Sequence, residues 1–140
     1  MSDWLLDTNI LSELRKPRPE QKVVDFIAQQ PLTTLFVSSV TFAEIGFGIE
    51  QIQDSSKNLA LTTWLNTQLR PMFDGRVLPI TEEVMLIWRR LVEQGRKQGH
   101  TFPQPDLIIA ATALQYNLTV VSRDSGGYAH TGVRLLNPWA

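Results

Sequence analysis

The chain has 140 residues, no cysteine and a net charge of −1, and 43% of its residues are hydrophobic and 19% charged. This length suits one domain with its own core, so we expect a single domain over residues 1–140. The absence of cysteine excludes disulfides and thiolate metal sites, and the near-neutral charge argues against a general basic coat for nucleic acid. No apolar run has the length of a signal peptide or a membrane span, so we expect a soluble, cytoplasmic protein without membrane contact.

The first half of the chain predicts two strands, each followed by helices. Residues 4–7 (WLLD) indicate a short buried strand, and residues 35–40 (LFVSSV) indicate a second strand that is rich in β-branched side chains. Apolar residues at helical spacing predict helices at residues 10–14, 21–30, 41–52 and 55–73.

The second half predicts three more strands. They cover residues 75–80, 118–124 and 133–138. Helices are expected after Thr81, with Glu82 and Glu83 in the first turn, and at residues 106–117, whereas residues 100–105 and 125–132 are expected to be loops. Strands that alternate with helices in this way predict an α/β fold, a three-layer α/β/α sandwich with a central parallel sheet.

Four acidic residues fall at strand ends or helix starts. Asp7 and Asp124 end strands, Glu44 lies in the first turn after the second strand, and Asp106 begins a helix. The C-terminal ends of parallel strands open on one side of a sheet, so these carboxylates are expected to meet there. Crowded carboxylates repel each other, and oxygen-only ligands favour Mg²⁺ or Mn²⁺. Such an ion can activate water for phosphodiester hydrolysis.

Each acid also has a purely structural interpretation. These are a helix cap for Asp7, a Thr41-x-x-Glu44 capping box, a helix start for Asp106 and a turn residue before Ser-Gly-Gly for Asp124. Only their shared position at one edge of the predicted sheet favours a metal site over four separate structural roles.

Five segments resemble a known family in their order along the chain: LLDTNILSEL, VSSVTFAEI, PDLIIAATAL, TVVSRD and LLNPW. Together they are similar to a PIN domain, and specifically to the VapC-type toxins of bacterial type II toxin–antitoxin pairs, near the FitB-like branch. The resemblance extends from Leu5 to Trp139.

The resemblance implies a Mg²⁺- or Mn²⁺-dependent endoribonuclease with a PIN-like fold. Its catalytic and metal-binding residues would be Asp7, Glu44, Asp106 and Asp124. Thr8 would match the family's hydroxyl beside the first acid, and Asn9 would match its structural amide in the same turn. The resemblance also implies a homodimer, a cognate antitoxin that blocks the pocket, and promoter DNA bound only through that antitoxin.

An RNA substrate needs cations near an acidic pocket. Arg123 adjoins Asp124 and is the supporting residue that we expect at the pocket. Further cations follow the first helix at Arg15, Lys16 and Arg18, and a second set lies within residues 89–97, where a solvated helix face is the simpler interpretation.

The segment after Asp124 departs from the family pattern. Gly127 stands where many members carry a further acid, and Asp124 occupies the position of a usual asparagine. This leaves open a second function, that of a weakly cleaving or non-cleaving PIN protein that acts in a regulatory complex of antitoxin and DNA.

Overall fold

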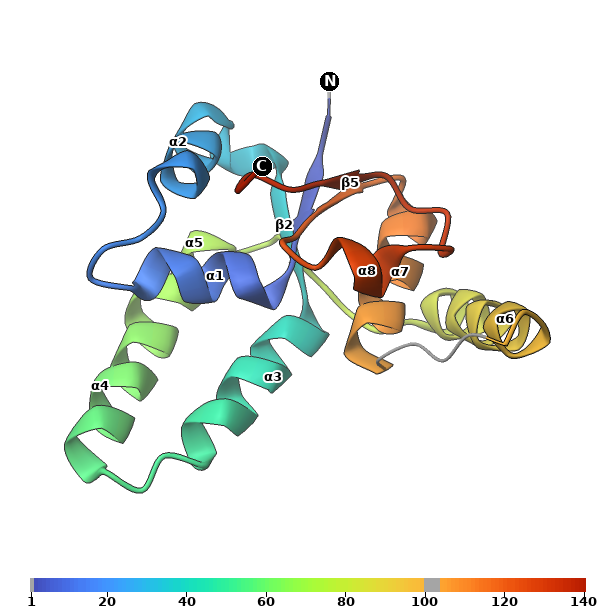
Figure 1. Cartoon of the computed structure of the whole chain (residues 1–140). Helices are drawn as coiled ribbons and strands as arrows, with labels where there is room; N and C mark the ends of the chain where they lie inside the picture. The colour runs from blue at the N-terminus through green and yellow to red at the C-terminus, as the bar shows by residue number, and fades with distance from the viewer. Residues whose placement is uncertain (1, 100–103) are drawn as a thin grey trace.

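The computed structural model describes residues 2–99 and 104–140, which form a parallel sheet with helices on both faces (Figure 1). The strand order is β3-β2-β1-β4-β5, and every neighbouring pair is parallel. The strands are β1 (Trp4–Leu6), β2 (Leu35–Ser38), β3 (Val77–Leu78), β4 (Thr119–Val121) and β5 (Leu135–Leu136).

The helical segments fill the connections between these strands. They are α1 (Thr8–Arg15), α2 (Gln21–Gln29), the 3₁₀ turn η1 (Leu32–Thr34), α3 (Ser39–Glu50), α4 (Ser55–Trp64), the π-helical turn η2 (Leu65–Leu69), α5 (Arg70–Met72), α6 (Glu82–Lys97), α7 (Gln104–Tyr116) and α8 (Ser125–Tyr128). Within the described ranges, no helix combines the length and the apolar character that a transmembrane segment requires.

Two hydrophobic cores lie on opposite faces of the sheet. Successive strand residues point to opposite sides, so Leu6 and Val121 join one core while Leu5 and Val120 join the other. The first core is closed by α1 to α5 and the second by α6 to α8, and Figure 1 shows these two sets of helices on either side of the strands. The predicted three-layer sandwich with a central parallel sheet is therefore confirmed.

The strand order reverses between β1 and β4. From β1 the chain proceeds to β2 and β3 on one side, whereas β4 and β5 lie on the other. The Asp7 N–H donates to the Val121 carbonyl at 3.0 Å, so the turns after β1 and β4 begin side by side. Such a reversal opens a crevice at the C-terminal ends of the strands, which is the usual ligand position in open α/β sheets.

The predicted strands are longer than the observed ones, for example residues 35–40 against Leu35–Ser38 for β2, and three helical predictions also differ from the structure. The helix predicted at residues 55–73 is interrupted by η2, because Pro71 has no backbone N–H to continue an α-helical ladder. The loop predicted at residues 125–132 contains α8, which Asp124 caps by accepting from the Gly127 N–H. The helix predicted from Asp106 begins at Gln104, and residues 100–103 of the predicted loop lie outside the described residues.

The first core predicts a testable stability difference. Phe73 is fully buried and makes an edge-to-face contact with Phe42, with ring centroids 6.4 Å apart. Phe73→Ala is expected to lower the free energy of unfolding by about 3–5 kcal/mol because it leaves a cavity. Urea denaturation measures this loss. Leu59→Ala is the control because Leu59 is 67% exposed, and an equal loss in both variants would contradict the core assignment.

Candidate functional site

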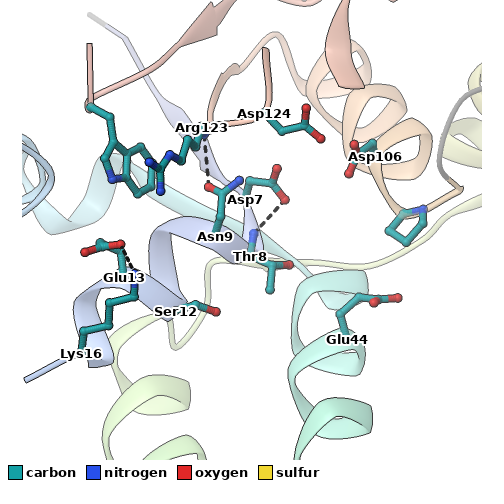
Figure 2. Close-up of a pocket in the computed structure, with 12 residues that line it drawn as sticks. Asp7, Thr8, Asn9, Ser12, Glu13, Lys16, Glu44, Asp106, Arg123 and Asp124 are labelled. Atoms are coloured by element: carbon teal, nitrogen blue, oxygen red, sulfur yellow. Dashed lines mark hydrogen bonds and ion pairs between the residues drawn. The ribbon is translucent and has the colours of Figure 1, made fainter. Parts of the chain in front are cut away.

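A cavity of about 470 Å³ lies at the C-terminal ends of β1 and β4 (Figure 2). It brings together all the residues for which the sequence predicts a role in the site: Asp7, Thr8, Asn9, Glu44, Asp106, Arg123 and Asp124. They come from α1, α3, α7 and the turns after β1 and β4, so the fold gathers side chains that are up to 117 positions apart in the sequence.

Asp7 is the most firmly held of the four acids. Its side chain is buried, and Oδ1 accepts from the Thr8 N–H at 2.8 Å as the N-cap of α1. Its Oδ2 accepts from the Ser122 hydroxyl at 2.7 Å and from the Tyr128 hydroxyl at 2.9 Å. Asp7 therefore both caps α1 and lines the cavity, so its structural and functional interpretations are compatible.

Ser122 and Asn9 join the turn after β1 to the turn after β4. The Ser122 Oγ accepts from Asn9 Nδ2 and from the Asp124 N–H, both at 3.0 Å. The Asn9 Oδ1 accepts from the Arg123 N–H at 3.3 Å. The position of Asp124 relative to Asp7 is thus fixed by hydrogen bonds to residues that are not themselves acidic.

Ser122 and Tyr128 are site residues that the sequence pattern does not predict. Both are buried polar side chains, and burial together with the nearby negative charges of Asp7 and Asp106 raises the pKa of Tyr128. The tyrosine therefore stays protonated and acts as a donor to Asp7. The only signal in the sequence is that each hydroxyl flanks Asp124 within the segment 122–128.

Asp106 and Asp124 converge over a glycine. A Cβ atom at Gly127 would lie 2.3 Å from Asp106 Oδ2 and 2.5 Å from Asp124 Oδ2, which is far inside normal contact distance. Figure 2 shows these two carboxylates facing each other. The absence of a side chain at Gly127 is therefore the feature that lets both carboxylates occupy this space.

The charge around Asp106 is not balanced. Burial raises the pKa of Asp106 to about 7, with further contributions from the charge of Asp7, from a hydrogen bond with Asp124 and from the charges of Asp124 and Glu44. Without a cation, Asp106 thus retains its proton far above the ordinary range of a carboxylic acid.

Glu44 lies apart from the three aspartates, and its predicted capping box is wrong. The cap of α3 is Ser38, whose hydroxyl accepts from the Val40 N–H at 3.1 Å, so Glu44 lies in the second turn of the helix. Thr41 is buried, and its Oγ1 has no hydrogen-bond partner among the described residues. The Glu44 side chain is exposed, and its carboxylate forms no hydrogen bond with any residue that the structure describes. The predicted capping role therefore does not explain this acid.

The donor chemistry of the cavity suits a hard divalent cation. Its acids offer oxygen ligands only, and their unbalanced charge is the condition that a cation relieves. However, over residues 2–99 and 104–140, no three His, Asp or Glu side chains lie close enough together to hold a metal ion as they stand.

The other predicted cations take different roles. Lys16 lines the cavity but pairs with Glu13 at 2.9 Å, and Arg15 lies over the Trp64 ring at 6.0 Å. The basic side chains within residues 89–97 belong to α6, which packs against α7 away from α1 (Figure 1) and does not line the cavity. This set is therefore a helix face and not a wall of the site.

Comparison with known proteins identifies the family. Residues 4–132 match the PIN domain model. The chain is 35% identical to Toxin FitB of Neisseria gonorrhoeae over 96% of this chain and 97% of that protein, and 32% identical to VapC ribonuclease Y4jK of Sinorhizobium fredii over 96% of each. A solved structure of FitAB bound to an IR36 DNA fragment superimposes with a TM-score of 0.91 at 33% identity and covers 98% of this chain and 96% of that chain.

This chain therefore belongs to the PIN-domain family, and its fold is that of the solved FitAB relative. Within that family it groups with the VapC- and FitB-type toxins of toxin–antitoxin systems, as the sequence resemblance predicts.

The raised pKa of Asp106 predicts how stability depends on pH. In metal-free protein the folded state keeps this proton up to about pH 7, whereas the unfolded chain releases it near 3.8. The contribution of Asp106 to stability is therefore present below pH 4 and is lost as the pH rises to 7. Asp106→Asn is expected to become more stable than the wild type between pH 5 and pH 8, as measured by urea denaturation in EDTA. Asp74→Asn, which changes an exposed carboxylate outside the cavity, should show no such trend, and a parallel trend in both variants would contradict the assignment.

The close approach at Gly127 predicts a steric effect. Gly127→Ala is expected to push Asp106 and Asp124 apart and to reduce the rise in melting temperature that Mn²⁺ causes. Gly126→Ala is a matched control in the same short helix, because its Cβ would lie 3.9 Å from the nearest atom, Asp124 Oδ1. The two changes have similar effects on backbone entropy, so a difference between them reports the contact alone. Equal Mn²⁺ responses would show that the space over Gly127 is not needed.

Proposed function

We propose that this protein is a metal-dependent endoribonuclease, the toxin of a type II toxin–antitoxin pair, which hydrolyses RNA phosphodiester bonds. The observation that carries the proposal is the convergence of Asp7, Asp106 and Asp124 on one cavity at the point where the strand order reverses, with Glu44 on the same cavity. Its relative Y4jK bears the name VapC ribonuclease, which supports the same activity for this chain.

Asp7, Glu44 and Asp106 would hold a Mg²⁺ or Mn²⁺ ion, and Asp124 would help to hold a second ion or orient the attacking water. When bound, the metal would neutralise charge at the scissile phosphate and lower the pKa of a water molecule, which provides a nucleophile at neutral pH. The chain's own contribution is to hold the acids in place: Ser122 and Tyr128 donate to Asp7, and Ser122 fixes the Asp124 backbone. Burial and the neighbouring carboxylates hold a proton on Asp106, and Asp106 would have to lose this proton before it could act as a ligand.

The partners follow from the family. We propose a homodimer in the bacterial cytoplasm and a cognate antitoxin that blocks the cavity and links the toxin to promoter DNA. The FitAB relative was solved with a DNA fragment, which supports a DNA-bound complex of this kind. RNA is the substrate, and we assign no direct DNA contact to this chain.

Two observations favour the second candidate function, that of a weakly cleaving protein in an antitoxin–DNA complex. The described acids do not converge closely enough to hold an ion as they stand, and Gly127 replaces the family's further acid. Under this alternative the protein would still bind its antitoxin, but catalytic amounts of the protein would leave RNA intact.

An RNA cleavage assay separates the two functions. Purified protein is expected to degrade bacterial RNA with Mg²⁺ and to lose this activity in EDTA. Asp106→Asn should lower the rate roughly a hundredfold or more, because it removes a carboxylate that would hold the metal ion beside the reacting phosphate. Asp74→Asn should retain the wild-type rate, and circular dichroism should show that both variants are folded. Intact RNA under all conditions, with the protein folded, would favour the regulatory function.

A further inference from the structure

The cavity has a second end, opposite in charge to the first. Thr8 and Ser12 lie four residues apart on one face of α1, Lys16 is the C-cap residue at the end of this helix, and all three line the cavity, so they form one row along it. Eight residues of helix extend about 12 Å. The row therefore leads from Asp7, at the start of α1, toward a cationic end at Lys16 and Arg123.

Arg123 is the cation at this end that is available to a ligand. Lys16 is already paired with Glu13, and the other Glu13 oxygen accepts from the Glu20 N–H at 2.8 Å. Among the residues that the structure describes, no carboxylate forms an ion pair with Arg123. Figure 2 shows the Arg123 side chain pointing away from Asp124, so the adjacent acid in the sequence does not neutralise it.

The guanidinium of Arg123 is also held in orientation. Its carbon Cζ lies 5.2 Å from the centre of the Trp139 ring, within the range of a cation–π contact. Its backbone N–H is held by Asn9, and Trp139 itself packs against the first hydrophobic core. A guanidinium that stacks on a ring keeps its N–H edge free, and this edge matches two oxygens of a phosphate.

We infer that Arg123, supported by Trp139, binds an RNA phosphate other than the scissile one. This inference rests on the proposed ribonuclease function. A stacked strand rises about 3.4 Å per nucleotide, so a cavity wall of about 12 Å accommodates about three nucleotides. A strand with its scissile phosphate at the acids therefore carries a second phosphate, within about three nucleotides, toward Arg123. The pair positions the substrate and does not take part in the bond cleavage.

RNA is the ligand that these observations favour over a protein carboxylate. The site combines a phosphate-shaped donor fork, an aromatic ring beside it and a path along α1 to the proposed cleavage centre. Backbone phosphates have the same spacing whatever the base sequence, so a fixed second phosphate site aligns the strand with the acids without selecting a base.

Binding is tested with a fluorescein-labelled 12-nucleotide oligouridylate, followed by fluorescence anisotropy over a salt series. The protein carries Asp106→Asn so that the RNA stays intact. Adding Arg123→Gln is expected to weaken binding roughly tenfold at low salt and to reduce the slope of log K against log salt by about 0.7, the value for one phosphate contact on a single strand. Arg18→Gln is the matched control, since it removes an exposed charge outside the cavity, and it should leave the slope unchanged.

Two further variants separate charge from orientation. Arg123→Lys should retain the salt slope but lose several-fold in affinity, because it keeps the charge without the planar fork. Trp139→Phe should keep most of the affinity, whereas Trp139→Leu should approach Arg123→Gln. Melting temperatures identify any variant that has lost its fold. In otherwise wild-type protein, Arg123→Gln should raise KM for RNA cleavage while kcat changes less than twofold.

The outcomes distinguish this inference from the function on which it rests. If wild-type protein cleaves RNA and Arg123→Gln matches Arg18→Gln in affinity and KM, the phosphate site is wrong and the ribonuclease function stands. If Arg123→Gln weakens only the complex with the cognate antitoxin, the ligand is a protein group and the inference is overturned. A protein that neither binds nor cleaves RNA overturns both.

Discussion

The hydrogen bond from the Ser122 hydroxyl to Asp7 is the interaction on which the site depends. It joins residues 115 positions apart, and it exists because β1 and β4 are neighbours at the point where strand order reverses. The same oxygen of Ser122 accepts from Asn9 and from the Asp124 backbone, so one buried hydroxyl coordinates both turns. Removing the Ser122 hydroxyl is expected to lower the free energy of unfolding, since its partners would remain buried without a hydrogen bond.

The acidic side chains of the cavity differ in how firmly the fold holds them. Asp7 and Asp124 each cap a helix, Asp7 also accepts from two hydroxyl groups, and Asp106 faces Asp124 over a glycine. Glu44, in contrast, is an exposed side chain without hydrogen bonds to the described residues, and it lies on a different helix. Three carboxylates are thus positioned by folding, while the fourth keeps its rotamer freedom.

The sheet, its layers and the meeting of the acids were predictable because they follow from local patterns. Short apolar strands between helices specify a parallel sheet, and acids at strand ends then share one edge. Ser38 and Thr41 both suit the N-cap of α3, and the choice between them depends on where β2 ends, since α3 begins directly after the strand at Ser39. The roles of Ser122 and Tyr128 were missed because their partner is Asp7, and no local pattern reports a contact across more than a hundred residues.

The distribution of site residues along the chain has a consequence during synthesis. Asp7 emerges from the ribosome early, but its donors Ser122 and Tyr128, together with Asp124, emerge only when the last fifth of the chain has been made. A nascent polypeptide that ends before β4 has neither the strand beside β1 nor the cavity that depends on it. An incomplete translation product of that kind therefore lacks the acidic cavity altogether.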